Sequence, residues 1–406
     1  MIRKLTTWQE WMESDRIIAT AFLHEWDEKK SEEAFKAQAS GEKERKEEAW
    51  GLFDDTGKMT STIVTEPRRL TFEGAEIACD EVHMVGSLPE ARGGGSIRSL
   101  MGELLRTMKA KGDPFAVLIP FSFAFYRKFG FELATSSMSQ KIQIEQFQPF
   151  ICTYRVKQVA SQEDANAVRE LYQAWSLSGN LASVKEDKDW LYHGNGEFGE
   201  RDWWFGNKQR YTYLFYEGDT AKAYLKFVFK EGPSGPFTGS MEVIDIAFTD
   251  PEALRNVFGF IYGMRAKITE VKLDLPTEID LSLMMPECDK VERKMGGHTM
   301  ARVLNVEAVL SKMKHPAGRG MYRIAIDDKF LPENTGTYEV CYEDDRAVRV
   351  NRTDEAADMT VTVETFCQLA IGLVDLQAAL YRTGTQILGN EEVLRQVFVR
   401  KRILTD

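Results

Sequence analysis

The stretch Arg92–Arg98 has the composition of an anion-binding loop. It reads Arg-Gly-Gly-Gly-Ser-Ile-Arg and stands between a strand-like segment and an amphipathic helix. Successive small residues let a ligand approach the backbone, and the N-terminus of the following helix adds N–H groups and partial positive charge. This combination suits a pyrophosphate. If only the glycines are considered, a flexible turn between a strand and a helix is an equally good interpretation.

The spacing around these glycines argues against two common phosphate loops. No Lys follows them, so the GxxxxGK[ST] pattern of P-loop nucleotidases is missing. The GxGxxG pattern and an acidic partner about 20 residues further on are also missing, which weakens a dinucleotide-binding interpretation. The loop therefore predicts a phosphate-bearing ligand of another kind.

A second group with useful chemistry is the phenol of Tyr126, in the aromatic stretch Phe121–Phe131. A tyrosine, with an ordinary pKa of about 10, carries at neutral pH a proton that it can give to a leaving group. The alternative interpretation is a core aromatic residue packed among Phe123, Phe125 and Phe129.

The elements that would position both groups follow the order of a βαβ unit. Strand-like patterns at 76–87 and 115–119 flank apolar residues at helical spacing over 97–110. The loop and the tyrosine thus follow the ends of two strands that we expect to be neighbours.

Two further regions complete the predicted organisation. A strand at 241–248 leads into a helix at 251–264 through Asp250 and Pro251, a conventional helix start without glycines. We interpret this region as a related domain whose loop cannot hold phosphates. From about residue 300, short strands followed by helices predict a separate α+β unit.

Composition limits the class of protein. The chain has 406 residues, enough for two or three domains, and a net charge of −11, which disfavours nucleic acid as a partner. The N-terminus has no apolar signal segment and no apolar run is long enough to cross a bilayer, so we expect a cytoplasmic protein without membrane contact. The five cysteines and five histidines lack metal-ligand spacing, so no metal site is expected.

The loop and the aromatic stretch together resemble one known family. Pro89–Gly95 is similar to the acetyl-CoA loop of GNAT acetyltransferases, Pro-Glu-x-Arg-Gly-x-Gly, with Arg92 and Gly95 at matching positions. Ile97 stands where Gly or Ala is usual, a departure that recurs in the Eis-like (enhanced intracellular survival) branch. Tyr126–Phe131 resembles the Tyr-x-x-Phe-Gly-aromatic motif that follows the fifth GNAT strand.

The resemblance implies an α/β and α+β architecture of three parts. Eis-like proteins have an N-terminal GNAT domain, a degenerate GNAT-like domain and a sterol-carrier-protein-like domain, which would lie here at 1–150, 151–298 and 299–406. The step from strand to helix at Val361–Gly372 is similar to that of the last module. Eis-like proteins assemble into hexamers, so a homo-oligomer is expected.

The resemblance also implies roles for particular residues. Acetyl-CoA is the family's co-substrate, no metal is required, and the tyrosine of the motif, here Tyr126, is the general acid. In Eis-like proteins the C-terminal carboxylate is the base, here that of Asp406, and a water-mediated route is the alternative because the usual terminal aromatic residue is missing. The residues expected to hold acetyl-CoA are Val85, Gly86, Ser87, Arg92, Gly93, Gly94, Gly95, Ser96, Ile97, Arg98, Phe121 and Ser122.

The expected reaction is direct transfer of acetyl to a primary amine. Candidate acceptors are cationic small molecules, such as aminoglycosides or polyamines, and peptides. Glu25 and Asp27 are candidates for receiving a cation, and a solvated charged face is the alternative interpretation. The rival function is a non-enzymatic carrier of a lipid or another apolar ligand.

Overall fold

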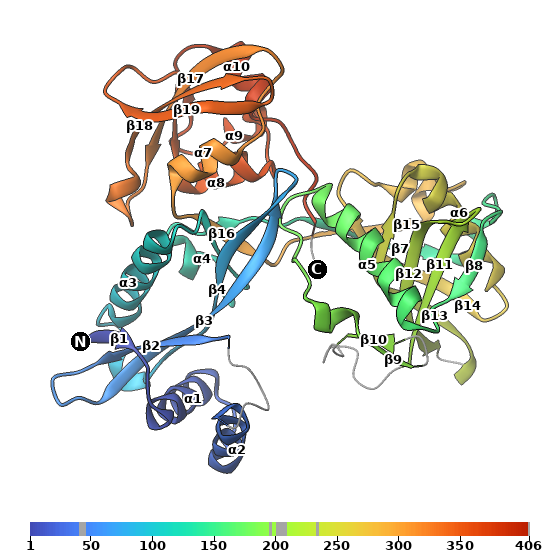
Figure 1. Ribbon diagram of the computed structural model, residues 1–406, viewed down its shortest axis with the longest axis horizontal. Helices are drawn as coiled ribbons and strands as arrows, with labels where there is room; N and C mark the ends of the chain where they lie inside the picture. The colour runs from blue at the N-terminus through green and yellow to red at the C-terminus, as the bar shows by residue number, and fades with distance from the viewer. Residues whose placement is uncertain (40–45, 195–196, 200–208, 233–234, 405–406) are drawn as a thin grey trace. The chain divides into compact units, whose positions relative to one another are not determined.

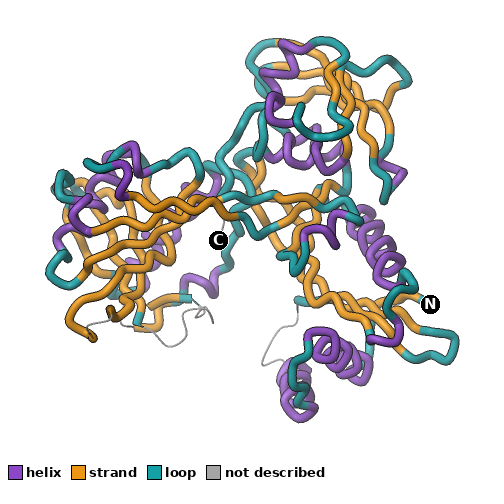
Figure 2. Tube along the Cα trace, turned by 180° about the vertical axis from the view of Figure 1, so that it is seen from behind, coloured by secondary structure: helices purple, strands orange, loops and turns teal. Residues whose placement is uncertain are grey.

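A computed structural model describes residues 1–39, 46–194, 197–199, 209–232 and 235–404. They form two compact units. The first unit joins Met1–Thr135 to His298–Lys401, and the second contains Ser136–Gly297 with the residues after Lys401. Figures 1 and 2 show helices and sheets in both units, which confirms the predicted α/β and α+β class.

A seven-stranded sheet is the centre of the N-terminal domain, which we define as Met1–Thr135 with strand β16. The strand order is β1-β2-β3-β4-β5-β16-β6, with β4 and β5 as a parallel pair. Helices α1 and α3 cover opposite faces of this sheet (Figures 1 and 2). The elements are β1 (Ile2–Lys4), α1 (Trp8–Phe22), α2 (Glu28–Ala39), β2 (Glu48–Phe53), β3 (Met59–Phe72), β4 (Ala75–Ser87), α3 (Ser96–Lys111), β5 (Phe115–Leu118), α4 (Phe123–Arg127), β6 (Glu132–Leu133) and β16 (Met300–Val303).

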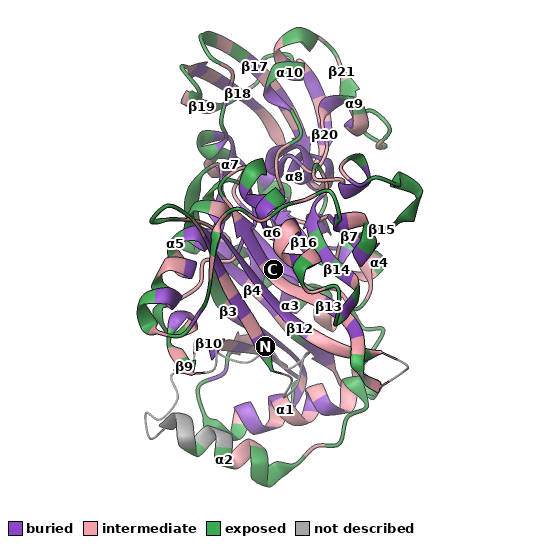
Figure 3. Cartoon of the chain, turned by 90° about the vertical axis from the view of Figure 1, so that its right-hand side faces the viewer, coloured by how far each residue is buried: buried purple, intermediate pink, exposed green. Residues whose placement is uncertain are grey.

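Local signals account for the two covering helices. α1 follows a capping box, in which the Thr7 hydroxyl accepts from the Glu10 N–H and the Glu10 carboxylate accepts from the Thr7 N–H. α3 ends at Gly112 in the left-handed conformation (φ 96°). It buries one apolar stripe, made of Leu100, Met101, Leu104, Leu105 and Met108. Figure 3 shows buried residues along much of β3 and part of β4, whereas the described side chains of α2 are exposed or intermediate.

One strand of this sheet comes from far along the chain. β16 lies between β5 and β6 and pairs antiparallel with both. β7 (Ser137–Gln143), which directly follows the N-terminal domain in sequence, pairs instead with β14 and β15 of the second unit. The compact units therefore change over after Thr135 and before His298. The domain limits 1–150, 151–298 and 299–406 remain predictions.

The central domain (Ser136–Gly297) has a second seven-stranded sheet of order β15-β7-β14-β13-β12-β11-β8. Apolar clusters lie on both of its faces, one beneath α6 and the other beneath α5. Its further elements are β8 (Arg155–Gln158), α5 (Gln162–Leu177), β9 (Tyr192–Gly194), β10 (Glu197–Phe198), β11 (Arg210–Glu217), β12 (Thr220–Gly232), β13 (Gly235–Phe248), α6 (Pro251–Gly263), β14 (Ile268–Pro276) and β15 (Val291–Gly296).

The C-terminal module (residues 304–401) has a five-stranded sheet of order β19-β18-β17-β20-β21. Helix α8 contacts β20 and β17 of this sheet and also β16 and β6 of the N-terminal domain. It therefore forms a shared core within the first unit. The elements of the module are α7 (Val306–Lys312), β17 (Arg319–Asp327), β18 (Gly336–Glu343), β19 (Arg346–Thr353), β20 (Met359–Thr362), α8 (Val363–Ile371), α9 (Leu376–Ala379), β21 (Gln386–Ile387) and α10 (Glu391–Val397).

The described ranges contain no helix with the length and apolarity needed to cross a membrane. Within the same ranges, no group of three His, Cys, Asp or Glu side chains is placed to hold a metal ion. The cysteines are free thiols, and Cys79 and Cys367 are buried.

Asp113 is a carboxyl buried between the end of α3 and the start of β5, with a relative exposure of 7%. Burial raises its pKa to about 6, and the nearby Asp80 carboxylate adds to the rise. Its Oδ2 atom has no hydrogen-bond partner in the described part of the chain. The ionised form of Asp113 is therefore disfavoured in the folded state.

We expect Asp113→Asn to stabilise the protein at pH 7.5 and not at pH 4. The folded-state pKa of about 6 lies above the unfolded value, so the folded state holds this proton longer. The free energy of unfolding of the unchanged protein therefore falls by about 1–2 kcal/mol as pH rises from about 4 to about 6. The side-chain amide of the Asp113→Asn variant does not ionise, so the variant avoids this loss. Urea unfolding at both pH values measures the difference. Asp55→Asn, at an exposed turn position, is the control. Equal effects of Asp113→Asn at both pH values would contradict the assignment.

Candidate functional site

A cavity of about 670 Å³ in the N-terminal domain collects most of the residues expected to hold acetyl-CoA. The end of β4 (Val85–Ser87), the loop and first turn of α3 (Arg92–Arg98) and Phe121 line it. Of the predicted set, Gly94 and Ser122 are not among the lining residues. Three segments that are separate in sequence therefore meet at one site.

The loop before α3 needs glycine at two positions. Gly93 and Gly95 have φ angles of 84° and 80°, a left-handed conformation that L side chains rarely adopt. Gly95 is the N-cap of α3, which has no side-chain cap and no acidic residue in its first turn. The first N–H groups of a helix lack partners within it, so those of α3 are left for a ligand.

The corresponding helix of the central domain is closed by its own side chain. Asp250 caps α6, and its Oδ1 accepts a hydrogen bond of 2.9 Å from the N–H of Ala253. A carboxylate at this position occupies the N-terminus and repels phosphate. This contrast supports the prediction that only the first of the two loops can hold phosphates.

Strand β4 separates from the parallel strand β5 before it reaches the cavity. β5 pairs with β4 only at Asp80 and Glu81 among the described residues, so the last residues of β4 pair with β3 alone. A register shift opposite Thr62–Val64 places a bulge in β4 at Met84, whose φ is 48°. The divergence leaves N–H and C=O groups at the end of β4 on the side of the cavity.

α1 packs directly on β4 at Gly86. A Cβ atom at this position would lie 3.4 Å from the backbone of Ile18 and 3.5 Å from the Cβ of Ala21. The adjacent Ser87 hydroxyl is 2.9 Å from the Ser61 hydroxyl. The floor of the cavity is therefore held by close packing and one hydroxyl pair.

The charged side chains that line the cavity are all cationic. They are Arg92, Arg98 and Lys128, and none of the described lining residues is acidic. Together with the start of α3 they give a positive field, which suits a ligand that bears several phosphate charges. The same field disfavours a free cationic amine in this part of the site.

Tyr126 lies directly behind the cavity wall. It belongs to α4, whose N-cap Ser122 accepts a hydrogen bond from the Phe125 N–H, and its relative exposure is 4%. Its ring makes edge contacts with Phe121 (centroids 5.4 Å apart) and Phe125 (5.1 Å), which both line the cavity. Burial raises the pKa of Tyr126 to about 12, so the phenol keeps its proton at neutral pH.

The predicted substrate and base residues lie elsewhere. Glu25 and Asp27 are exposed residues in the connection between α1 and α2 and do not line the cavity. Asp27 accepts hydrogen bonds from the N–H groups of Lys29 and Lys30 at the start of α2, which is a capping role. Asp406 lies outside the described residues.

Sequence reasoning missed several residues that line the cavity: Ala21, Phe22, Ala91, Phe125, Lys128 and Phe129. Three of them lie in the aromatic stretch 121–131: Phe125, Lys128 and Phe129. Their position close to Tyr126 in sequence could therefore have identified them. Ala21 and Phe22 come from the end of α1, and nothing in their local pattern indicates that α1 would cross β4 at this point.

Family models match three consecutive parts of the chain. Residues 1–134 match an acetyltransferase (GNAT) domain, residues 188–303 match a second acetyltransferase (GNAT) domain, and residues 306–403 match a sterol carrier protein domain. The chain therefore contains two acetyltransferase (GNAT) domains. The order of the three matches confirms the predicted plan of two GNAT-type domains followed by a sterol-carrier-protein-like module.

Known proteins share this arrangement over nearly their whole length. An uncharacterized N-acetyltransferase of Streptomyces coelicolor is 22% identical over 81% of this chain and 80% of its own. Eis1 from Mycobacterium abscessus aligns over 100% of this chain and 98% of its own, with a TM-score of 0.76 and 16% identity. A probable N-acyltransferase from Enterococcus faecalis aligns over 100% and 99%, with a TM-score of 0.79 and 20% identity. The Eis-like resemblance is thus confirmed in the fold of this GNAT acetyltransferase.

We expect Gly95→Ala to weaken CoA binding about tenfold, because a displaced first turn of α3 loses a hydrogen bond to a charged phosphate. Gly57→Ala, in the turn between β2 and β3, is a matched control. Gly57 has a φ of 82°, and a Cβ atom added there would meet nothing within 4 Å, as at Gly95. Both variants should lose about 1 kcal/mol of stability through backbone strain. Calorimetric titration with CoA separates them. Equal affinities would remove Gly95 from the site.

Proposed function

We propose that this GNAT acetyltransferase transfers acetyl from acetyl-CoA to a primary amine at the cavity of the N-terminal domain. The observation that carries the proposal is the meeting of an uncapped helix N-terminus, three cationic side chains and the free end of β4 around one cavity. The helix start and the cations suit the phosphates of CoA. The end of β4 suits its acyl end, which must reach beyond the phosphates.

In the proposed reaction, the amine nitrogen attacks the thioester carbonyl carbon. A C–N bond forms, the C–S bond breaks, the amine loses one proton, and the CoA thiolate gains one. Negative charge collects first on the carbonyl oxygen, and the proposed groups that stabilise it are backbone N–H groups at the end of β4 near Val85, where β4 pairs with β3 alone. No oxidant or metal is needed for this balance.

Tyr126 is the proposed donor to the departing thiolate. Its raised pKa of about 12 keeps it protonated, so it acts as a hydrogen-bond donor while the C–S bond breaks. The same value makes the phenol a weaker acid than an ordinary tyrosine, and complete transfer therefore comes late, when charge on sulfur is fully developed in the same water-poor surroundings.

The proposed acceptors are cationic small molecules, such as an aminoglycoside or a polyamine, or a peptide amine. A net charge of −11 favours encounter with such cations. The positive lining of the cavity supports its proposed use by the cofactor, and in this proposal the amine approaches the acyl group from outside the cavity. Glu25 and Asp27 remain proposed receiving groups for the amine.

We expect Tyr126→Phe to lower kcat by about 10²–10⁴-fold while CoA affinity changes less than twofold, because the hydroxyl acts only as the thiolate leaves. Release of the CoA thiol against a panel of aminoglycosides, polyamines and peptides measures turnover, and calorimetry measures affinity. Tyr381→Phe, at a residue with 87% relative exposure, is the control for loss of a tyrosine hydroxyl.

Two results would contradict these assignments. Full turnover in Tyr126→Phe would exclude the hydroxyl as donor while leaving the acetyl transfer in place. Failure of the unchanged protein to bind CoA at millimolar concentration would overturn the proposed function and favour the carrier of an apolar ligand.

A further inference from the structure

The C-terminal module contributes side chains to the core of the N-terminal domain. Its loop between β17 and β18, residues 328–335, carries Phe330 and Leu331 into the apolar cluster beneath α3. Leu331 is fully buried there, beside residues of the same cluster that include Tyr126 and Phe129. The module therefore packs against the apolar residues that support the proposed acetyl-CoA site.

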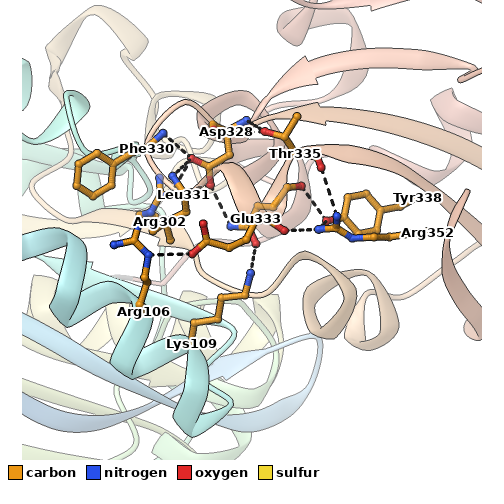
Figure 4. Close-up of polar contacts among 11 residues, drawn as sticks. Arg106, Lys109, Arg302, Asp328, Phe330, Leu331, Glu333, Thr335, Tyr338 and Arg352 are labelled. Carbon is orange, nitrogen blue, oxygen red and sulfur yellow. Dashed lines mark hydrogen bonds and ion pairs between the residues drawn. The ribbon is translucent and has the colours of Figure 1, made fainter. Parts of the chain in front are cut away.

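A buried ion pair holds this loop in its conformation. Asp328 and Arg302 of β16 both have a relative exposure of 0%, and the Arg302 Nη2 atom donates to the two carboxylate oxygens at 2.9 and 2.7 Å. The same carboxylate accepts from the N–H groups of Phe330 and Leu331 and from the side chain of Asn334 (Figure 4). One aspartate thus fixes the turn that presents Phe330.

Side chains of α3 bind the outer part of the loop. The Lys109 Nζ atom donates to the Asn334 side chain at 2.5 Å, and Arg106 pairs with Glu333 at 3.3 Å (Figure 4). Phe330 lies close to the backbone of α3 at Gly102, where an added Cβ atom would be in van der Waals contact with the ring at 3.7 Å. The loop therefore lies along the same helix whose first turn lines the cavity.

Phe330 itself contacts two residues that line the cavity. The guanidinium carbon of Arg98 lies 5.0 Å from the centre of the Phe330 ring, and the ring of Phe129 lies 5.3 Å from it in an edge arrangement. Arg98 belongs to the first turn of α3, and Phe129 belongs to the motif that contains Tyr126. The Phe330 ring therefore contacts both Arg98, which is expected to bind phosphates, and Phe129, which lines the cavity near Tyr126.

The tyrosine motif has further supports from the same module. At Gly130 (φ 80°), a Cβ atom would lie 1.6 Å from the Arg302 guanidinium and 3.4 Å from Val363 of α8. Glu132, which is buried, accepts from Arg127 of α4 at 2.7 Å and from Arg382 of the module at 2.6 Å. The module therefore contacts this segment through Val363, beside Gly130, and through Arg382, at Glu132, whereas Arg302 belongs to β16 of the N-terminal domain.

We propose that Phe330 is a positioning residue for the cofactor, through which the C-terminal module sets the orientation of Arg98 toward the phosphates of CoA. The inference rests on the proposed function. An arginine on the surface has many rotamers, and an aromatic face that attracts its guanidinium reduces the entropy lost on binding. The sterol-carrier-like module thereby has a role in cofactor binding that requires no lipid ligand.

A double-mutant cycle on the full-length chain tests this inference. We expect Phe330→Leu, which keeps an apolar side chain but removes the ring, to weaken CoA binding about two- to fivefold. Arg98→Ala should weaken it at least as much. The double variant should bind no more weakly than Arg98→Ala alone, because Phe330 acts through Arg98. Phe330→Tyr should restore affinity to within twofold of the unchanged chain.

Glu333→Gln is the control in the same loop, since it removes only the partly exposed pair with Arg106 and should leave CoA affinity unchanged. Thermal unfolding of every variant verifies that affinity is measured on folded protein. Additive losses in the double variant would overturn the coupling between Phe330 and Arg98, and so would an unchanged affinity in Phe330→Leu. If the unchanged chain does not bind CoA, the proposed function fails and this inference fails with it.

Discussion

Buried backbone N–H groups need hydrogen-bond partners, and the site lies where a strand and a helix start do not provide them. β4 separates from β5 beyond Glu81, and α3 begins at Gly95 without a capping side chain. Both openings face the same cavity, so the unsatisfied donors converge there. The central domain shows the other outcome, because Asp250 satisfies the start of α6 internally. The presence or absence of one capping side chain therefore distinguishes the starts of these two helices.

The supports of the cavity extend well beyond its lining. A fully buried ion pair is stabilising only when its charges are well hydrogen-bonded. Asp328 meets this condition with four donors, whereas the Nε and Nη1 atoms of Arg302 have no hydrogen-bond partner in the described part of the chain. Removal of either partner would leave a buried charge alone, a loss of about 3–5 kcal/mol. The same pair fixes the loop that carries Phe330. Stability of the C-terminal module and geometry of the cofactor loop thus depend on shared contacts.

Local sequence patterns predicted most helices and strands, but they could not predict the pairing of strands that lie far apart in sequence. β4, α3, β5 and α6 begin and end within one residue of the limits predicted from periodicity and from the helix start at Asp250 and Pro251. The glycine loop and Tyr126 were recognisable because their chemistry is contiguous in sequence. In contrast, the placement of β16 between β5 and β6 depends on pairing across some 170 residues, for which a short apolar strand carries no local signal. The contributions of α1 and of the loop 328–335 to the site follow from the same kind of packing.

The insertion of β16 also constrains how the chain is made. A ribosome releases residues 1–135 long before Met300–Val303, yet the first sheet lacks an internal strand, and its core lacks Arg302, until those residues emerge. The edges of β5 and β6 that β16 covers are open during that interval, and open edges invite pairing with other chains. Synthesis of the N-terminal domain alone should therefore yield a protein that depends on chaperones, and the order of translation becomes part of the folding problem.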